Sequence, residues 1–157
     1  MSDAVKDFNK AMLKVAEIYR EEILSGLKYV GNECIRIIRE QGRPNDWTDQ
    51  TSNLRSSVGF AVYEYGKTWF ESAFEPIKPT GWPGHFKGLD VVDELAKQYS
   101  ETFALVIVAG MDYAEYVEKK RDVLASTELW AKAYIEQALG TFMKKAEIRA
   151  QAILDHL

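Results

Sequence analysis

The stretch "TSNLRSSVGFAVYEYG" (residues 51–66) decides how this chain folds, because a compact polar turn runs directly into a strand. Six of its first seven residues are polar, and the following residues are rich in valine, phenylalanine and tyrosine, which favour strands. Gly66 then marks a turn before a second strand-like run, "TWFESAF". The pattern predicts a β-hairpin over residues 58–74. Both of its faces carry aromatic residues, which predicts a sheet that is covered on both sides.

The polar residues at the start of this stretch have a structural interpretation. The hydroxyls of Thr51, Ser56 and Ser57 are placed to hydrogen-bond the backbone around a tight helical turn. Leu54 is expected to fix that turn to the core. Alternation along the strand then puts Val58, Phe60 and Val62 on one face.

Long helices are predicted on either side of the hairpin. Apolar residues recur at spacings of three and four over residues 3–41, with Gly26 as a candidate break and Gly42 and Pro44 as the stop signal. A helix of this length needs a partner surface for its apolar stripe. A second long amphipathic helix is predicted over residues 127–155.

The region between them combines a loop with shorter elements. Residues 75–89 hold three of the four prolines and three of the ten glycines, which predicts a long surface loop. A helix over 90–100, a buried strand over 102–109 and a short helix over 113–120 are expected to follow. Grouped strands predict an α+β fold, a small mostly antiparallel sheet (the hairpin plus a third strand) packed by the long N- and C-terminal helices.

Length and composition restrict the class of protein. A chain of 157 residues predicts one domain, 1–157, and 46% apolar with 28% charged residues is ordinary for a globular protein. The net charge of −4 argues against a dedicated nucleic-acid binder. The longest apolar run, residues 103–109, is too short for a membrane span, so no membrane is expected as a partner. The single cysteine excludes an internal disulfide and predicts a reducing compartment.

Few residues are candidates for catalysis. His156 is the penultimate residue, and His85 has no second histidine, cysteine or paired carboxylate beside it in the sequence. We expect His85 to stack on Trp82 or Phe86, and Cys34 to be a buried thiol on the apolar stripe of the first helix. No phosphate-binding glycine loop and no zinc-ligand spacing occurs in the sequence. The prediction is a protein that is not an enzyme and has no cofactor and no metal.

One dense basic cluster, Lys119-Lys120-Arg121, stands at the end of the short predicted helix. It would attract DNA phosphates, or it would simply place cations where the helix dipole favours them. The second interpretation is preferred.

Two stretches together, "DQTSNLRSSVGFAVY" (49–63) and "VIVAGMDYAEYVEKK" (106–120), resemble the signature of the tailed-bacteriophage neck proteins, also called head–tail joining or tail-completion proteins. Ser52 stands where the family usually has glycine, and Lys119 and Lys120 stand where a second glycine would fall. The order of the predicted elements agrees as well. The positions that match the family motif are Thr51, Leu54, Ser57, Val58, Gly110, Tyr113, Ala114, Tyr116, Val117 and Glu118.

The resemblance implies a structural virion protein of a tailed phage or prophage, which completes the tail end and joins it to the head. Copies would form a ring, expected to be a hexamer, stacked on other phage neck and tail proteins. DNA would pass through without sequence-specific binding. The protein would be found in the virion, and in the host bacterial cytoplasm during assembly. Partner contacts are expected at the exposed-looking aromatic and basic positions, Trp82, Phe86, Tyr113, Tyr116, Lys119, Lys120 and Arg121.

Two other classes of function stay open at this point. A cytoplasmic adaptor or regulatory binding domain would use the long helices to pair with a partner helix, and would form a stable dimer. A small hydrolase would need a base, and His85 is the only residue available for it.

Overall fold

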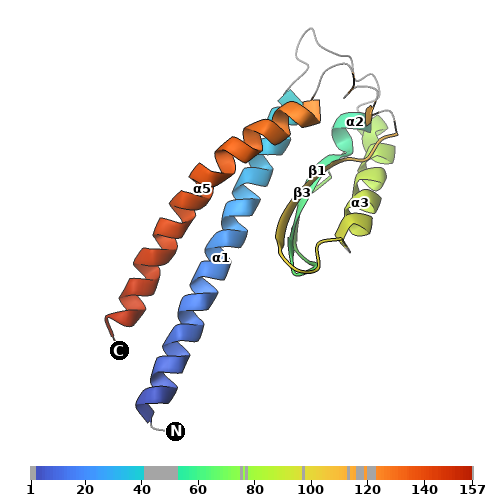
Figure 1. Cartoon of the computed structure of the whole chain (residues 1–157). Coiled ribbons are helices and arrows are strands. Elements are labelled where there is room, and N and C mark those ends of the chain that lie inside the picture. The colour runs from blue at the N-terminus through green and yellow to red at the C-terminus, as the bar shows by residue number, and fades with distance from the viewer. Residues whose placement is uncertain are drawn as a thin grey trace.

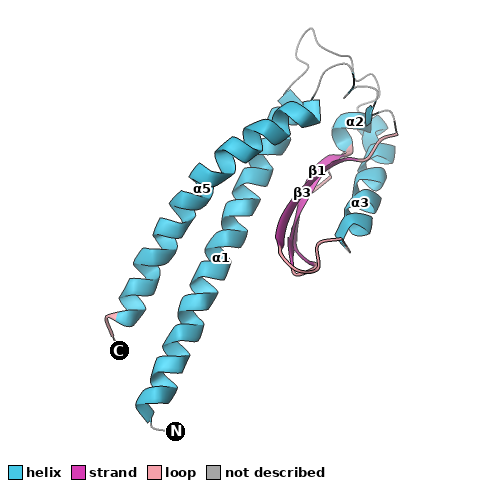
Figure 2. Ribbon diagram, in the orientation of Figure 1, coloured by secondary structure: helices cyan, strands magenta, loops and turns pink. Residues whose placement is uncertain are grey.

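The computed structural model describes residues 3–40, 53–74, 76, 78–96, 98–112, 114–115, 119 and 123–156. The chain forms a three-stranded antiparallel sheet in the order β2-β1-β3 with long helices at both ends, which confirms the α+β prediction (Figures 1 and 2). No helix among the described segments combines the length and apolar content needed to cross a membrane. The elements in order are α1 (Asp3–Glu40), α2 (Asn53–Ser56), β1 (Val58–Glu64), β2 (Lys67–Glu71), the 3-10 turn η1 (Pro79–Gly81), α3 (Trp82–Ala96), β3 (Phe103–Ala109) and α5 (Val123–Leu154).

The central strand β1 is buried on both faces. Val58, Phe60 and Val62 pack against the middle and C-terminal part of α1, as alternation predicts. Ala61 and Tyr63 point to the opposite face and pack with α3 and the segment after β2. Figure 1 shows the sheet lying between α1 and α3. The two-sided cover expected from the aromatic residues of the hairpin is therefore confirmed.

Helix α1 is continuous through Gly26, so the predicted break there does not occur. A Cβ atom at Gly26 would lie 3.0 Å from Leu139 and 3.2 Å from Phe142, both on α5. A Cβ at Gly31 would lie 2.4 Å from the ring of Phe60 on β1. Both glycines therefore allow close packing: Gly26 lets α1 approach α5, and Gly31 lets α1 approach β1.

Helices α1 and α5 form an antiparallel hairpin that extends well beyond the sheet (Figure 1). The N-terminal part of α1 and the C-terminal part of α5 run together to one end, where both chain termini lie. Arg149 of α5 bridges to Glu21 at 2.9 Å and to Glu22 at 2.7 Å on α1. The two long helices thus pack against each other along much of their length, and against the sheet along only part of it.

The predicted loop over 75–89 and the predicted helix over 90–100 are wrong in their bounds, because α3 begins at Trp82 and ends at Ala96. Pro83 is the second residue of α3, in the first turn of a helix, where its missing N–H is not needed. A Cβ at Gly84 would lie 1.9 Å from the carbonyl oxygen of Asn53, and one at Gly88 would lie 2.3 Å from Phe74. These glycines let α3 approach α2, Ser57 and Phe74 closely.

The other predicted elements agree more closely with the structure. The third strand spans Phe103–Ala109, within one residue of the predicted 102–109. The last helix begins at Val123, four residues before the predicted start at 127. The helix predicted over 113–120 lies mostly outside the described residues.

Replacement of Gly31 by valine should destabilise the fold, because its side chain would overlap the ring of Phe60 in a packed core. Overpacking of this kind costs about 2–3 kcal/mol, which urea unfolding measures directly. Gly140→Val is the matched control in α5, where a Cβ meets nothing within 4 Å. The control should stay within about 0.5 kcal/mol of the parent protein. Equal stability of the two variants would contradict the close contact.

A bidentate ion pair between Arg20 of α1 and Glu64, at the end of β1, joins the β-hairpin to α1. The Nε and Nη2 atoms of Arg20 donate to the two carboxylate oxygens of Glu64, and Nη1 donates to Glu17 at 2.6 Å. The hydrogen bonds from Arg20 are the main cause that lowers the pKa of Glu64. The charged form of Glu64 is therefore favoured in the folded state.

Glu64→Gln should lower the stability of the fold at neutral pH and should change how that stability depends on pH. A carboxylate whose folded pKa is lowered stabilises the fold above its unfolded pKa of 4.5, and that contribution is lost as the pH falls through the folded pKa. The difference in urea midpoint between parent and variant should shrink steadily below pH 4.5. Glu147→Gln, on the exposed side of α5, is the control and should show no such convergence. A difference that is constant with pH would contradict this role.

Candidate interaction surfaces

The two stretches singled out in the sequence, residues 49–63 and 106–120, meet at one end of the sheet. Val58, at the start of β1, pairs with Ala109, at the end of β3. One step further along, the N–H of Gly110 donates to the carbonyl oxygen of Ser57 at 3.2 Å. Residues about fifty positions apart in the sequence therefore form one continuous piece of structure.

The polar turn before β1 is built by backbone and hydroxyl hydrogen bonds. The N–H of Ser57 donates to the carbonyls of Asn53 and Leu54, at 2.9 and 3.1 Å, and its hydroxyl donates to that of Leu54 at 2.7 Å. Leu54, Ser56 and Ser57 are buried. Arg39, near the end of α1, donates to the carbonyl of Val58 at 2.9 Å. The structural role expected for Ser57 and Leu54 is confirmed, and Thr51 lies outside the described residues.

The second stretch is described only in part. A Cβ at Gly110 would lie 2.6 Å from the carbonyl oxygen of Lys87, so α3 passes directly beside this position. The N–H of Ala114 donates to the carbonyl of Met111 at 2.8 Å, and Lys119 is exposed and bridges to Glu115 at 2.6 Å. The roles expected for the remaining residues stay predictions, since these lie outside the described part: Tyr113, Tyr116, Val117, Glu118, Lys120 and Arg121.

An aromatic cluster lies on the first turns of α3. Trp82 and Phe86 are 50% and 59% exposed, and their rings stack at 6.1 Å between centroids. His85 contacts both rings, but edge-on, at 5.2 and 5.0 Å between centroids, and not stacked on either ring as expected from the sequence; its Nδ1 contacts the carbonyl oxygen of Phe74. We call Trp82, His85 and Phe86 the α3 aromatic cluster. Trp82 and Phe86 present two large apolar side chains to solvent. The packing of α3 on the sheet is made by other residues, such as Val92, so these two side chains are not needed for it.

A second exposed apolar surface lies at the free end of the helical hairpin. Val5, Phe8 and Met12 continue the apolar stripe of α1 but are 43%, 52% and 43% exposed, and the neighbouring Leu13 is 73% exposed. Between Leu24 and Ile38 the same helix buries most of its apolar residues, although Tyr29 is 44% exposed. The sequence pattern did not distinguish these two parts, because the periodicity is the same in both. We call Val5, Phe8, Met12 and Leu13 the α1 tip.

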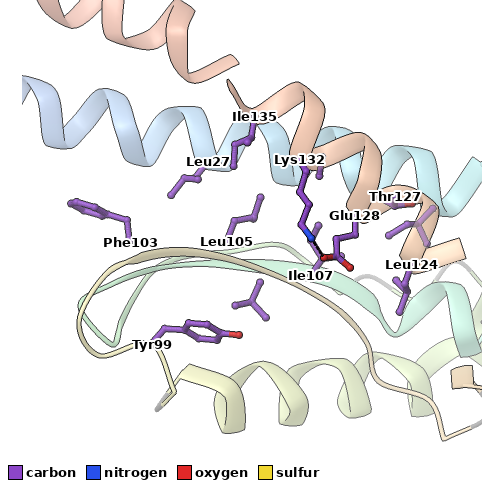
Figure 3. A pocket seen from close by; sticks show the side chains of 13 residues that line it. Leu27, Tyr99, Phe103, Leu105, Ile107, Leu124, Thr127, Glu128, Lys132 and Ile135 are labelled. Carbon is purple, nitrogen blue, oxygen red and sulfur yellow. Dashed lines mark ion pairs between the residues drawn. The ribbon is translucent and has the colours of Figure 1, made fainter. Parts of the chain in front are cut away.

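A groove of about 480 Å³ lies between β3, α1 and α5 (Figure 3). Its walls are mainly apolar, with Leu105 and Ile107 from β3, Ala131 and Ile135 from α5 and Leu27 from α1. Glu128 and Lys132 pair with each other at its rim. Sequence analysis missed this groove, because it depends on how α5 crosses the sheet.

No group of three or more histidine, cysteine, aspartate or glutamate side chains that could hold a metal ion occurs in the described part of the chain. Cys34 is fully buried, as expected, and burial together with the charge of Glu33 raises the pKa of its thiol to about 11. Burial also raises the pKa of Tyr63 to about 12, and its hydroxyl donates to the carbonyl of Val92 at 2.7 Å. Both groups are held in their neutral form and act as parts of the core.

Comparison with protein-family models, with curated proteins and with solved structures finds no match for this chain. The functional argument therefore depends on the chain's own residues and their geometry. The features that carry it are the joined motif stretches, the α3 aromatic cluster, the α1 tip and the groove beside β3.

Proposed function

We propose that this chain is a structural, non-enzymatic neck protein of a tailed phage or prophage, which completes the tail end and joins it to the head. Its copies would form a ring, in the virion, stacked on other neck and tail proteins. The host bacterial cytoplasm would be the place of assembly. Each part of this proposal is inferred from the resemblance of two sequence stretches and from surfaces of the fold.

The observation that carries the proposal is the meeting of the two stretches. A chance match of two short motifs has no reason to bring them together in space. Here the middle of the first stretch and the start of the second are neighbours, through the pairing of Val58 with Ala109 and the hydrogen bond from Gly110 to Ser57. This supports the view that the two motifs form one structural unit.

The exposed apolar surfaces support a role in assembly. Large apolar side chains gathered on the outside of a small domain are typical of contacts with other chains. The α3 aromatic cluster and the α1 tip lie on different elements, and the tip lies far from the sheet at the end of the helical hairpin (Figure 1). A subunit with separate apolar surfaces is suited to contact more than one neighbour, as a ring stacked on other rings requires.

The net charge of −4 fits a lumen through which DNA slides. Negative charge repels phosphates, so DNA would pass without being held. This part of the proposal needs no base-reading residues.

Early interruption of the reading frame in the strain that carries it tests the assignment. Electron microscopy of the induced lysate should show full heads and finished tails lying separately. Complementation with the intact gene should restore joined particles. Joined particles in the interrupted strain, at the parental level, would contradict an essential neck role.

The same strain maps the contact surface. Complementation with the double variant Trp82→Ser, Phe86→Ser should give at least about tenfold fewer joined particles, because exposed aromatic residues are frequent interface hot spots. Leu129→Ser, which removes an even more exposed apolar residue from α5, is the control and should restore joining. Normal joining with the double variant would exclude the α3 aromatic cluster as a contact.

The α1 tip also favours a second candidate function, a cytoplasmic adaptor that pairs its long helices with a partner helix. This function predicts a stable dimer of the purified chain, dissociated by Phe8→Ser, and no protein in purified particles. The neck assignment predicts instead that the chain is present in purified particles. The two functions are therefore separated by one measurement of particle composition.

A further inference from the structure

The two outer strands of the sheet differ in how well they are protected against further pairing. Within the described residues, β2 and β3 are both edge strands. Strand β2 has five residues, a charged residue at each end and an irregular register opposite Val62 and Tyr63. Such features discourage pairing with another strand. Strand β3 has seven residues, no charge and a regular register along its whole length.

The register identifies which backbone groups of β3 point outward. Gly110 donates to Ser57 and Tyr65 donates to Thr102, so even-numbered positions of β3 exchange hydrogen bonds with β1. In an antiparallel pair, the residues between them direct their N–H and C=O groups to the other side. Leu105 and Ile107 therefore present both backbone groups at the outer edge of the sheet.

The groove beside this edge is apolar and is overhung by α5. Leu105 and Ile107 form its floor, and Ala131 and Ile135 of α5 form part of its other wall. Figure 3 shows β3 running beneath α5, with the side chains of Leu105, Ile107 and Ile135 between them. A strand placed against β3 would thus receive backbone hydrogen bonds along one side and apolar contacts for every second side chain.

A second copy of the sheet does not fit this space. In each copy α1 covers β3, because Leu105 and Ile107 pack against the cluster that contains Leu27, Ile35 and Ile38. Pairing of two copies through their β3 strands would bring the α1 of one copy over the groove, where α5 of the other already lies. A single extended segment without its own covering helix avoids this clash.

We propose that the outer edge of β3 is a docking site for an extended segment of another polypeptide, which adds to the sheet as a fourth strand. The segment carries apolar residues at alternate positions, and these enter the groove beneath α5. Backbone pairing supplies affinity and the groove supplies selectivity for apolar side chains. The site does not depend on the neck assignment.

Selection from a library of random ten-residue peptides displayed on ribosomes, with the full chain as bait, tests the site. Enriched sequences should show apolar residues at every second position. A synthetic peptide of the most enriched sequence should bind Ala131→Glu at least tenfold more weakly than the parent chain, because the new carboxylate enters the groove. Ala133→Glu adds the same charge to the exposed side of α5 and should bind within twofold of the parent.

Two further measurements distinguish strand addition from non-specific apolar binding. N-methylation of the peptide at one set of alternate residues should abolish binding, while methylation at the other set leaves it intact. Hydrogen exchange at the amides of Leu105 and Ile107 should slow when the peptide binds. No enriched sequence, equal binding by the two alanine variants, indifference to N-methylation, or self-association of the chain through β3 would each overturn the proposal.

Discussion

The fold depends on the burial of β1 between two helices. Phe60 fills the space left by Gly31 of α1 on one face, and Phe74 occupies the space above Gly59 and Gly88 on the other. Neither ring fits if the facing residue carries a side chain. The sheet is small, so the covering helices supply most of the apolar contact that keeps it folded. Every surface discussed above is positioned by this three-layer arrangement of α1, sheet and α3.

Two functional consequences follow from that arrangement. Because β1 is central, β3 can pair with it only on the side away from β2, and this brings Gly110 against Ser57 and joins the two motif stretches. Because α1 is much longer than the sheet, it needs α5 as a second partner, and the two helices project together with an exposed apolar tip. The position of α5 on α1 also leaves the groove beside β3. The exposed apolar tip and the groove thus both follow from how β1 is covered.

Much of the fold could be predicted from the sequence, and the failures have physical causes. The long helices show strong periodicity, and the hairpin and the third strand are rich in strand-forming residues; the structure places all of these elements within a few residues of the prediction. The first two turns of α3 were missed because Pro83, Gly84 and Gly88 are local breakers, yet here they serve a first turn and close contacts with α2 and Phe74. The exposure of Phe8 and the burial of Leu24 could not be separated, since both belong to one stripe. The groove required knowledge of how α5 lies against the sheet.

The most direct test of the neck assignment is a cryo-electron microscopy reconstruction of particles purified from the strain that carries this gene, together with their protein composition. The account predicts that the chain is present in the particles and forms a ring at the head–tail junction, in which the α1–α5 hairpin and the three-stranded sheet are recognisable in each subunit. Particles that lack the chain, or a junction whose density is fully explained by other proteins, would contradict it.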